Sequence, residues 1–468
     1  MIKITNKLGL SSLVFAMSTM LVGCVQGDVQ SKSTQVTQTQ DENSDRQQSV
    51  SPFAMGVVHA INVGGNEYHD LSGIVYSADK IISGETRTLN EAIKGTQNPT
   101  LFQSYRQGEL EFSLPVEDGT FALTFLFAEP NESAQIGQRV FDVLVNDQVV
   151  IPDLDILPAR DVKPLSALTR SVSNIQSEDG KLNIKLQAKV GEPVLNGVIV
   201  RKSVQDTRNW SLIFQDEFNQ DGKPDPSKWS YNIWPAGQVN DEDQAYTDRL
   251  KNARVENGNL IIEAHKEEYG NAQYTSARLL TKGKADFLYG KVEMRIKVPA
   301  GQGTWPAAWM MPTDFFKYAT TCSPGGERQG DAKCDAWPNS GEIDILEHVG
   351  YDMNRVHGTV HTKSYYWVNF EQRKGSIEAE AVSENFRLYS LEWTPEYIFI
   401  SYDDIPYFYY HNEGEGWEAW PFDHPYHIIL NLAIGGGWGG AGGPTDDSIF
   451  PVRMEVDYVR IYQLADDN

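Results

Sequence analysis

The segment Val292-Glu-Met-Arg-Ile-Lys-Val298 alternates apolar and polar residues without a break, and this pattern decides the fold class. An alternation of period two places every second side chain on the same face of a β-strand. Phe121 to Phe127 and Lys181 to Val190 repeat the pattern earlier in the chain, and Tyr426 to Ile434 repeats it later. Such strands, separated by Gly, Pro and Asn turns, predict an all-β protein built from antiparallel β-sandwiches.

The distribution of tryptophan divides the chain into two predicted domains. All 11 tryptophans lie between Trp210 and Trp438, which places a boundary near residue 205. We therefore expect one β-sandwich over residues 53–204 and a second over residues 205–468. Residues 24–52 are rich in Gln, Ser and Thr and are predicted to form a flexible linker.

The first 23 residues resemble an export signal. Lys3 and Lys7 form a basic start, and Leu8 to Met20 is an apolar stretch too short to span a bilayer. Leu21-Val22-Gly23-Cys24 follows and resembles a bacterial lipobox, so we expect a lipid on Cys24; an ordinary signal peptide with a chance cysteine is the alternative. The protein is thus predicted to be lipid-anchored in the bacterial cell envelope, at the outer membrane or cell surface.

The charge balance narrows the possible partners. The chain has 64 acidic and 40 basic residues, a formal net charge of −24. This excess disfavours nucleic acid and anionic membrane surfaces as partners, and mildly disfavours a heavily sulfated polysaccharide. No run of 18 apolar residues occurs, so membrane contact is expected through the lipid anchor only.

Two further cysteines, Cys322 and Cys334, remain once Cys24 carries a lipid. An even pair of cysteines in an exported protein predicts a disulfide, and two free thiols are the alternative.

The ionisable chemistry is concentrated in Gly341-Glu-Ile-Asp-Ile-Leu-Glu-His348. On a regular strand Glu342 and Asp344 share one face, and a β-bulge around Ile345-Leu346 would return Glu347 to that face. Neighbouring carboxylates push one pKa up and another down, which gives an ionised nucleophile beside a protonated acid. Such pairs hydrolyse glycosidic bonds. An acidic strand on an exposed edge and a calcium site are the alternatives.

Glu342-Ile-Asp-Ile-Leu-Glu347 resembles the active-site signature of glycoside hydrolase family 16 in its bulged form. Further blocks over about residues 210–463 resemble the bacterial laminarinases, the endo-1,3-β-glucanases of that family. These blocks are Asp216-Glu-Phe218, Tyr274-Thr-Ser-Ala-Arg278, Gly303-Thr-Trp-Pro-Ala-Ala-Trp309, His357-Gly-Thr-Val-His361, Leu391-Glu-Trp-Thr-Pro395 and Asn431-Leu-Ala-Ile-Gly-Gly-Gly-Trp438. The resemblance implies a concanavalin-like jelly roll that cleaves internal β-1,3-glucosidic bonds without a catalytic cofactor.

The same resemblance implies a role for each matching residue. Glu342 is the expected nucleophile and Glu347 the acid/base, while Asp344 orients and tunes the nucleophile. We expect Trp305 and Trp309 to stack on glucose rings, with packing in the core as the alternative. His361 is expected beside the acid/base; with His357 it forms a conceivable zinc pair that lacks a third ligand. The remaining expected substrate-binding residues are Asn240, Arg278, Asn431 and Trp438.

Two features concern regions outside these motifs. Phe315 to Asn339 is an insert that departs from the compact family pattern, and it carries Cys322 and Cys334. The family often holds a structural Ca²⁺ far from the cleft, and Glu217, Gly258 and Asp457 lie in the matching motifs. Plain surface acids are the alternative to this calcium site.

The first domain resembles the malectin family, β-sandwiches that bind glucose-containing oligosaccharides. The resemblance covers about residues 55–203 and rests on Val57-Val-His-Ala-Ile-Asn-Val-Gly-Gly65, Phe141-Asp-Val-Leu-Val-Asn146, Asp153-Leu-Asp-Ile156 and Leu195-Asn-Gly-Val-Ile-Val200. It places Tyr76 and Tyr105 at the sugar-binding positions, and an inert spacer is the alternative.

The sequence therefore predicts a monomeric surface lipoprotein that hydrolyses a β-glucan of the laminarin type. Mixed-linkage β-1,3-1,4-glucan and algal galactans are alternative substrates within the same family. From another class, a non-catalytic glucan-binding protein would have lost the catalytic carboxylates, and this chain retains all three.

Overall fold

The computed structural model describes residues 51–160, 162–324, 333–369, 371–379 and 381–465. The predicted export signal, Cys24 and the linker up to residue 50 lie outside this part of the chain. Within the described residues, no helix is long and apolar enough to cross a membrane.

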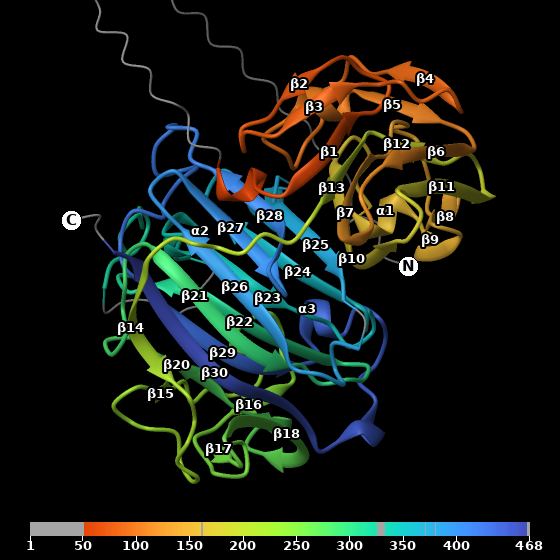
Figure 1. Cartoon of the computed structure of the whole chain (residues 1–468). Helices are drawn as coiled ribbons and strands as arrows, with labels where there is room; N and C mark the ends of the chain where they lie inside the picture. The colour runs from red at the N-terminus through yellow and green to blue at the C-terminus, as the bar shows by residue number, and fades with distance from the viewer. Residues whose placement is uncertain (1–50, 161, 325–332, 370, 380, 466–468) are drawn as a thin grey trace, which may run out of the picture. The chain divides into compact units, whose positions relative to one another are not determined.

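The fold is built almost wholly of strands (Figure 1). The strands of the first half are β1 (Val57–Asn62), β2 (Tyr68–His69), β3 (Val75–Ala78), β4 (Glu85–Thr88), β5 (Ser104–Gln107), β6 (Leu110–Pro115), β7 (Gly119–Ala128), β8 (Val140–Val145), β9 (Gln148–Leu154), β10 (Ala167–Ser177), β11 (Lys181–Val190), β12 (Val194–Leu195) and β13 (Gly197–Arg201). Those of the second half are β14 (Trp210–Asp216), β15 (Ser230–Tyr231), β16 (Gln244–Tyr246), β17 (Ala253–Glu256), β18 (Asn259–Tyr269), β19 (Ala272–Ser276), β20 (Arg278–Leu280), β21 (Gly290–Lys297), β22 (Thr304–Pro312), β23 (Glu342–Glu347), β24 (Arg355–His361), β25 (Arg373–Glu378), β26 (Arg387–Trp393), β27 (Tyr397–Tyr402), β28 (Ile405–His411), β29 (Tyr426–Ile434) and β30 (Val452–Leu464). The short helices are α1 (Ile156–Ala159), α2 (Ala336–Asn339) and α3 (Gly436–Gly439).

The second half is a sandwich of two sheets whose strand pairs are antiparallel except for β16 with β19. One sheet follows the order β15-β20-β29-β22-β23-β24-β25, and we call it the cleft sheet; the other follows β16-β19-β18-β30-β21-β26-β27-β28. The alternating segment that predicted the fold forms β21, and its apolar members Val292, Met294 and Ile296 are fully buried between the sheets. Ile343 and Ile345 reach the same core from the cleft sheet. The all-β prediction is confirmed.

The first half is a smaller sandwich. The sheet β10-β7-β13-β1-β3-β2 faces the sheet β6-β11-β8-β9. The alternating segment Lys181–Val190 forms β11, where Leu182, Ile184 and Leu186 are fully buried in the core.

The two sandwiches share hydrogen bonds through their edge strands. Ser171 of β10 pairs in parallel with Ile377 of β25, so the cleft sheet continues into the first sandwich as one sheet of 13 strands. Phe53 supports this seam, because its ring packs 4.9 Å from the ring of Tyr409. We expected two separate sandwiches, and alternation within single strands could not reveal an edge shared by two distant strands.

Candidate active site

A β-bulge in β23 brings three carboxylates to one face of the cleft sheet. Asp344 pairs with Thr359 and Glu347 pairs with His357. Between these two pairs β23 advances by three residues and β24 by only two. The register against β22 shifts at the same place. Because Ile345 and Leu346 both turn into the core, Glu347 returns to the side of Glu342 and Asp344. The predicted bulge is confirmed.

The three carboxylates open into a cleft with a volume of about 920 Å³. Its floor consists of side chains from β20, β22, β23 and β29 of the cleft sheet. Its rim is formed by the loop Gly237–Glu242, by part of the insert from Phe315 to Asn339, and by Lys363, Tyr366 and Val368. A cleft of this size accommodates a short run of sugar units.

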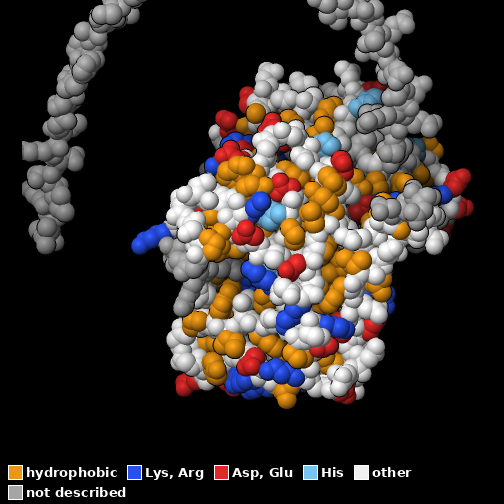
Figure 2. All heavy atoms as spheres, turned by 90° about the vertical axis from the view of Figure 1, so that its left-hand side faces the viewer, with side chains coloured by type: hydrophobic (Ala, Val, Ile, Leu, Met, Phe, Trp, Pro, Cys, Tyr) orange, Lys and Arg blue, Asp and Glu red, His pale blue; other side chains and the backbone are white. Residues whose placement is uncertain are grey.

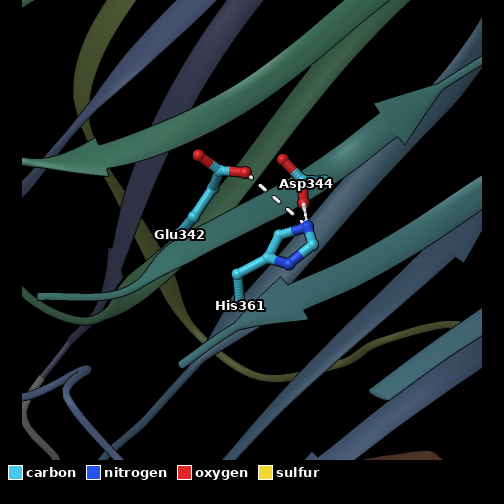
Figure 3. A group of neighbouring side chains, drawn as sticks. All are labelled: Glu342, Asp344 and His361. Carbon is cyan, nitrogen blue, oxygen red and sulfur yellow. Dashed lines mark ion pairs between the residues drawn. The ribbon is translucent and has the colours of Figure 1, made fainter. Parts of the chain in front are cut away.

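His361 lies against the two carboxylates at the start of β23 (Figure 3). Its Nε2 atom is 3.7 Å from Glu342 Oε1 and 3.4 Å from Asp344 Oδ2. We expected His361 beside Glu347; the register pairs it with Glu342, and its electrostatic interaction with Glu347 also lowers the pKa of that residue. The histidine therefore contacts the predicted nucleophile and Asp344.

Burial controls the protonation of all three acids. It raises the pKa of Glu342 to about 8 and that of Glu347 to about 8, and it raises the pKa of Asp344 well above its usual range. The expectation that one pKa would be lowered is wrong, since the cleft desolvates every carboxylate. The charge of Asp344 raises the other two further, so the three groups titrate together. His361 and Arg278 oppose this effect at Glu342 and favour its ionisation.

An indole N–H donates to each of the two glutamates. Trp305 Nε1 donates to Glu347 Oε1 at 3.1 Å, and Trp337 Nε1 donates to Glu342 Oε2 at 3.1 Å. Trp337 was not among the predicted site residues. The signal that could have found it is its position five residues before Glu342, inside the insert that precedes β23.

Arg278 and Trp309 form one wall of the cleft. The guanidinium of Arg278 lies 4.5 Å from the ring centroid of Trp234 and 4.6 Å from that of Trp309. Trp309 is only 9% exposed, and its Nε1 donates to Asn431 Oδ1 at 2.7 Å. Trp309 thus has its ring largely packed in the wall, closer to the packing alternative than to an open stacking platform.

The other predicted substrate-binding residues occupy two different places. Asn240 lines the cleft and donates to Glu242 at 3.2 Å. Trp438, by contrast, packs behind Trp305, with ring centroids 5.6 Å apart, and its other neighbour is His357 at 5.1 Å. Trp438 therefore packs against Trp305, which lines the cleft.

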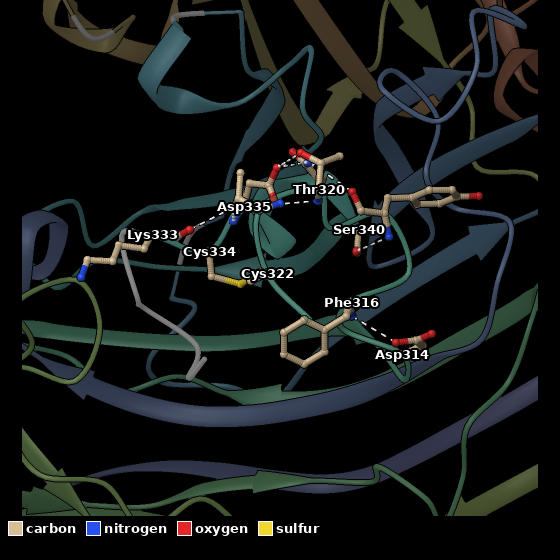
Figure 4. Close-up of a disulfide and its surroundings, with 11 residues drawn as sticks. Asp314, Phe316, Thr320, Cys322, Lys333, Cys334, Asp335 and Ser340 are labelled. Carbon is tan, nitrogen blue, oxygen red and sulfur yellow. Dashed lines mark hydrogen bonds between the residues drawn. A yellow bond between two sulfur atoms is a disulfide. The ribbon is translucent and has the colours of Figure 1, made fainter. Parts of the chain in front are cut away.

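The described part of the insert, residues 315–324 and 333–339, forms part of the rim of the cleft and contains a disulfide (Figure 4). Cys322 and Cys334 form a disulfide. Next to it, Asp335 accepts hydrogen bonds from the backbone N–H groups of Thr320 and Thr321 at 2.8 and 2.9 Å. Burial opposes ionisation of Asp335, but the hydrogen bonds from Thr320 and Thr321 prevail and lower its pKa to about 2.

Sequence comparisons agree with this geometry. Residues 240–460 match the model for glycosyl hydrolases family 16, and residues 57–205 match the model for the malectin domain. A β-glucanase of Rhodothermus marinus is 46% identical over 261 residues, which cover 54% of this chain and 86% of that protein. The chain belongs to glycosyl hydrolase family 16. It is therefore a glycoside hydrolase, with a malectin domain before the catalytic domain.

Two further relatives support the assignment. The glucan endo-1,3-β-glucosidase A1 of Niallia circulans is 35% identical over 280 residues, which cover 54% of this chain and 38% of that protein. The X-ray structure of the laminarinase from Rhodothermus marinus superposes with a TM-score of 0.50 at 45% identity. That superposition covers 56% of this chain and all of the laminarinase.

The residues predicted to bind calcium in the family 16 domain already have cationic partners. Both carboxylate oxygens of Glu217 accept hydrogen bonds from Arg460, at 2.8 and 2.9 Å. Asp457 pairs with Arg295, and Gly258 occupies a turn with φ of +78°. In this arrangement the two acids do not fit a calcium site, since each negative charge is neutralised by an arginine.

The two tyrosines predicted to bind sugar lie inside the malectin domain. Tyr76 is 2% exposed and packs against Tyr68, while Tyr105 is 7% exposed in the main core of the domain. Tyr76 lines a small pocket of about 110 Å³, but the low exposure of both rings leaves little surface on which a glucose ring could stack. The burial of both side chains contradicts this part of the prediction.

Proposed function

We propose that the chain is a retaining endo-hydrolase of internal β-1,3-glucosidic bonds in laminarin-type glucans. The observation that carries this proposal is the bulge that aims Glu342 and Glu347 into one cleft, with an indole donor on each. The names of the relatives, a β-glucanase and a glucan endo-1,3-β-glucosidase, support β-1,3-glucan as the substrate class.

In the proposed reaction Glu342 attacks the anomeric carbon while Glu347 protonates the departing glycosidic oxygen. A glycosyl ester forms on Glu342, and Glu347 then removes a proton from the water that hydrolyses it, with net retention. His361 and Arg278 stabilise the negative charge of Glu342 before attack. Burial raises the pKa of both glutamates to about 8, so Glu347 holds a proton near neutral pH, and the attack needs the form in which Glu342 is ionised, which the charge of Arg278 favours. No metal takes part in these steps.

The surface charge supports a neutral polysaccharide. On the face drawn in Figure 2, acidic and basic side chains lie interspersed among uncharged ones rather than gathered by sign. The net charge of −24 would repel a heavily sulfated chain.

Beyond the chemistry, we propose that the enzyme acts as a monomer anchored to the bacterial envelope through a lipid on Cys24. The basic start and the sequence Leu21-Val22-Gly23-Cys24 support this proposal. A structural calcium ion at Glu217 and Asp457 would require both acids to leave their arginines, so we propose no calcium site there.

A panel of substrates tests the proposed function. Laminarin, borohydride-reduced laminarin, lichenan and agarose are incubated with the enzyme, and the products are sized by chromatography. We expect laminarin and its reduced form to yield oligosaccharides of several lengths at similar rates, since internal cleavage needs no free chain end. Faster cleavage of lichenan or agarose would replace the proposed substrate, and release of glucose alone would contradict the endo mode.

A further inference from the structure

A row of residues crosses the cleft sheet from Glu347 to the malectin domain. The strand register pairs Glu347 with His357, and His357 with Ser376. Residues paired in this way carry their side chains on one face of a sheet. The hydroxyl of Ser376 accepts a hydrogen bond from Arg170 and donates to the carbonyl oxygen of Thr169 at 3.3 Å, both in β10. The row that begins at Glu347 therefore ends on the malectin domain.

Arg170 is an unusual residue for a seam between two domains. It is 3% exposed, and burial lowers the pKa of its guanidinium to about 9, which leaves it cationic at neutral pH. A buried cation costs free energy unless hydrogen bonds and counter-charges compensate it. Here Ser376 supplies the hydrogen bond, and Glu378 and Asp352 supply negative charge.

His357 transmits this contact to the active site. Arg170, Ser376 and His357 line the same small pocket, which has a volume of about 10 Å³. On its other side the imidazole packs against Trp438, which packs against Trp305. Trp305 donates the indole hydrogen bond to Glu347. His357 thus reaches Glu347 both by strand pairing and through two indoles in edge-to-face contact.

We propose that Arg170 of the malectin domain is a positioning residue for Glu347, acting through Ser376 and His357. The malectin domain is then a support of the catalytic acid/base, in addition to any role in sugar binding. This inference rests on the acid/base role proposed above for Glu347.

The test compares two leaving groups to distinguish a loss of proton donation by Glu347 from a general loss of activity. Departure of a sugar needs a proton from Glu347, whereas departure of 2,4-dinitrophenolate does not. We expect Arg170→Met to lower kcat/KM for laminaritetraose about tenfold, a part of the 10²- to 10⁴-fold that general acids contribute. The value of kcat/KM for 2,4-dinitrophenyl β-laminaribioside should stay within about twofold, since this ratio reports only the step that forms the glycosyl enzyme.

A matched control variant removes a contact between the two domains that lies outside this row of residues. Gln97 makes two hydrogen bonds to the backbone of His411, at 2.7 and 2.8 Å, and lies outside the row. Gln97→Ala should therefore leave kcat/KM for both substrates unchanged. Arg170→Lys, which keeps a charge and a donor, should recover part of the loss. If Arg170→Met does not fold, Ser376→Ala removes the acceptor with little change of volume and should show the same selective loss on a smaller scale.

The outcomes distinguish this inference from the proposed function. Glu347→Ala is the reference and should lose kcat/KM for laminaritetraose far more than for the aryl glycoside. If that variant shows no selectivity, the acid/base role itself fails. If it does, but folded Arg170→Met and Ser376→Ala lose both substrates equally or lose neither, the positioning role of Arg170 is wrong.

Discussion

Around Glu342 the tryptophans and charged groups surround a cleft of about 920 Å³, whereas around Tyr76 and Tyr105 the aromatic rings fill a core. Both regions carry aromatic residues on β-strands, and both were expected to contact sugar. The difference lies in the strand geometry. A bulge in β23 turns polar groups outward into the cleft, while β3 and β5 carry their tyrosines at buried positions. Residue type alone therefore does not place a binding site; the local register does.

The largest expected effect is at the nucleophile. Glu342→Gln removes the attacking oxygen charge but keeps the shape of the side chain, so we expect the rate of laminarin hydrolysis to fall at least about 10³-fold with the fold intact. The hydrolysis rate, with circular dichroism for the fold, gives the result. Proton NMR of fresh wild-type products should show the β-anomer first, as retention requires. An α-anomer appearing first would reverse the assignment of Glu342.

The corresponding substitution in the malectin domain, Tyr105→Ala, should lower the stability of the domain and leave sugar binding unchanged. Tyr105→Ala leaves a cavity in a buried core, and we expect a loss of about 3 to 5 kcal/mol in the free energy of unfolding. Urea unfolding measures this loss, and affinity electrophoresis in a laminarin gel measures retention by the glucan. A variant with unchanged stability but lost retention would mean that Tyr105 contacts sugar, and our interpretation of the domain would need revision.

The features of the fold and the site that depend on residues close together in the sequence could be predicted, and those that depend on residues far apart could not. The alternation of Val292–Val298 depends on neighbouring residues, so the sequence predicts the strand and its buried face. Spacing within one hexapeptide likewise predicted the bulge that returns Glu347 to the cleft. The contact of His361 with Glu342 depends on register between two strands, and the indole bond from Trp337 depends on the course of an insert. Contacts that depend on strand register or on the course of an insert produce no periodic pattern of apolar and polar residues in the sequence.

The seam between the domains shows the same limit. Arg170 lies two residues from both Leu168 and Val172, and nothing near it in the chain indicates Ser376 as its partner. The burial that raises all three acid pKa values is also collective, because it depends on every wall of the cleft.

A smaller effect should follow from those raised pKa values. The folded protein binds more protons than the unfolded chain between about pH 4.5 and pH 8, so its free energy of unfolding should fall as pH rises through this window. Asp344→Asn mimics the protonated form and removes part of this cost. We expect the variant to match wild type at pH 4 and to be more stable by about 1 kcal/mol or more at pH 8, since each pKa unit is worth about 1.4 kcal/mol.

Urea unfolding at pH 4, 6 and 8 checks this prediction, with hydrolysis measured in parallel. The same variant should lose activity, because the charge and orientation of Glu342 depend on Asp344. An equal difference in stability at all three pH values would show that Asp344 acts through packing instead of ionisation.

The smallest expected effect is far from both regions, at Glu217 and Asp457. A calcium ion bound only to the folded state would raise the melting temperature by mass action, and a chelator would lower it. Arg460 hydrogen bonds lower the pKa of Glu217, so this carboxylate already has a cation beside it, as Asp457 has in Arg295. These pairs are partly exposed, and each contributes at most about 1 kcal/mol. We therefore expect EDTA to shift the melting temperature by less than about 1 °C, and Arg460→Met to lower the free energy of unfolding by no more than that pair contributes. A fall of several degrees in EDTA, reversed by added Ca²⁺ and abolished in Glu217→Gln, would show that the ion displaces the arginines, and the pairing in this structure would then describe the calcium-free protein.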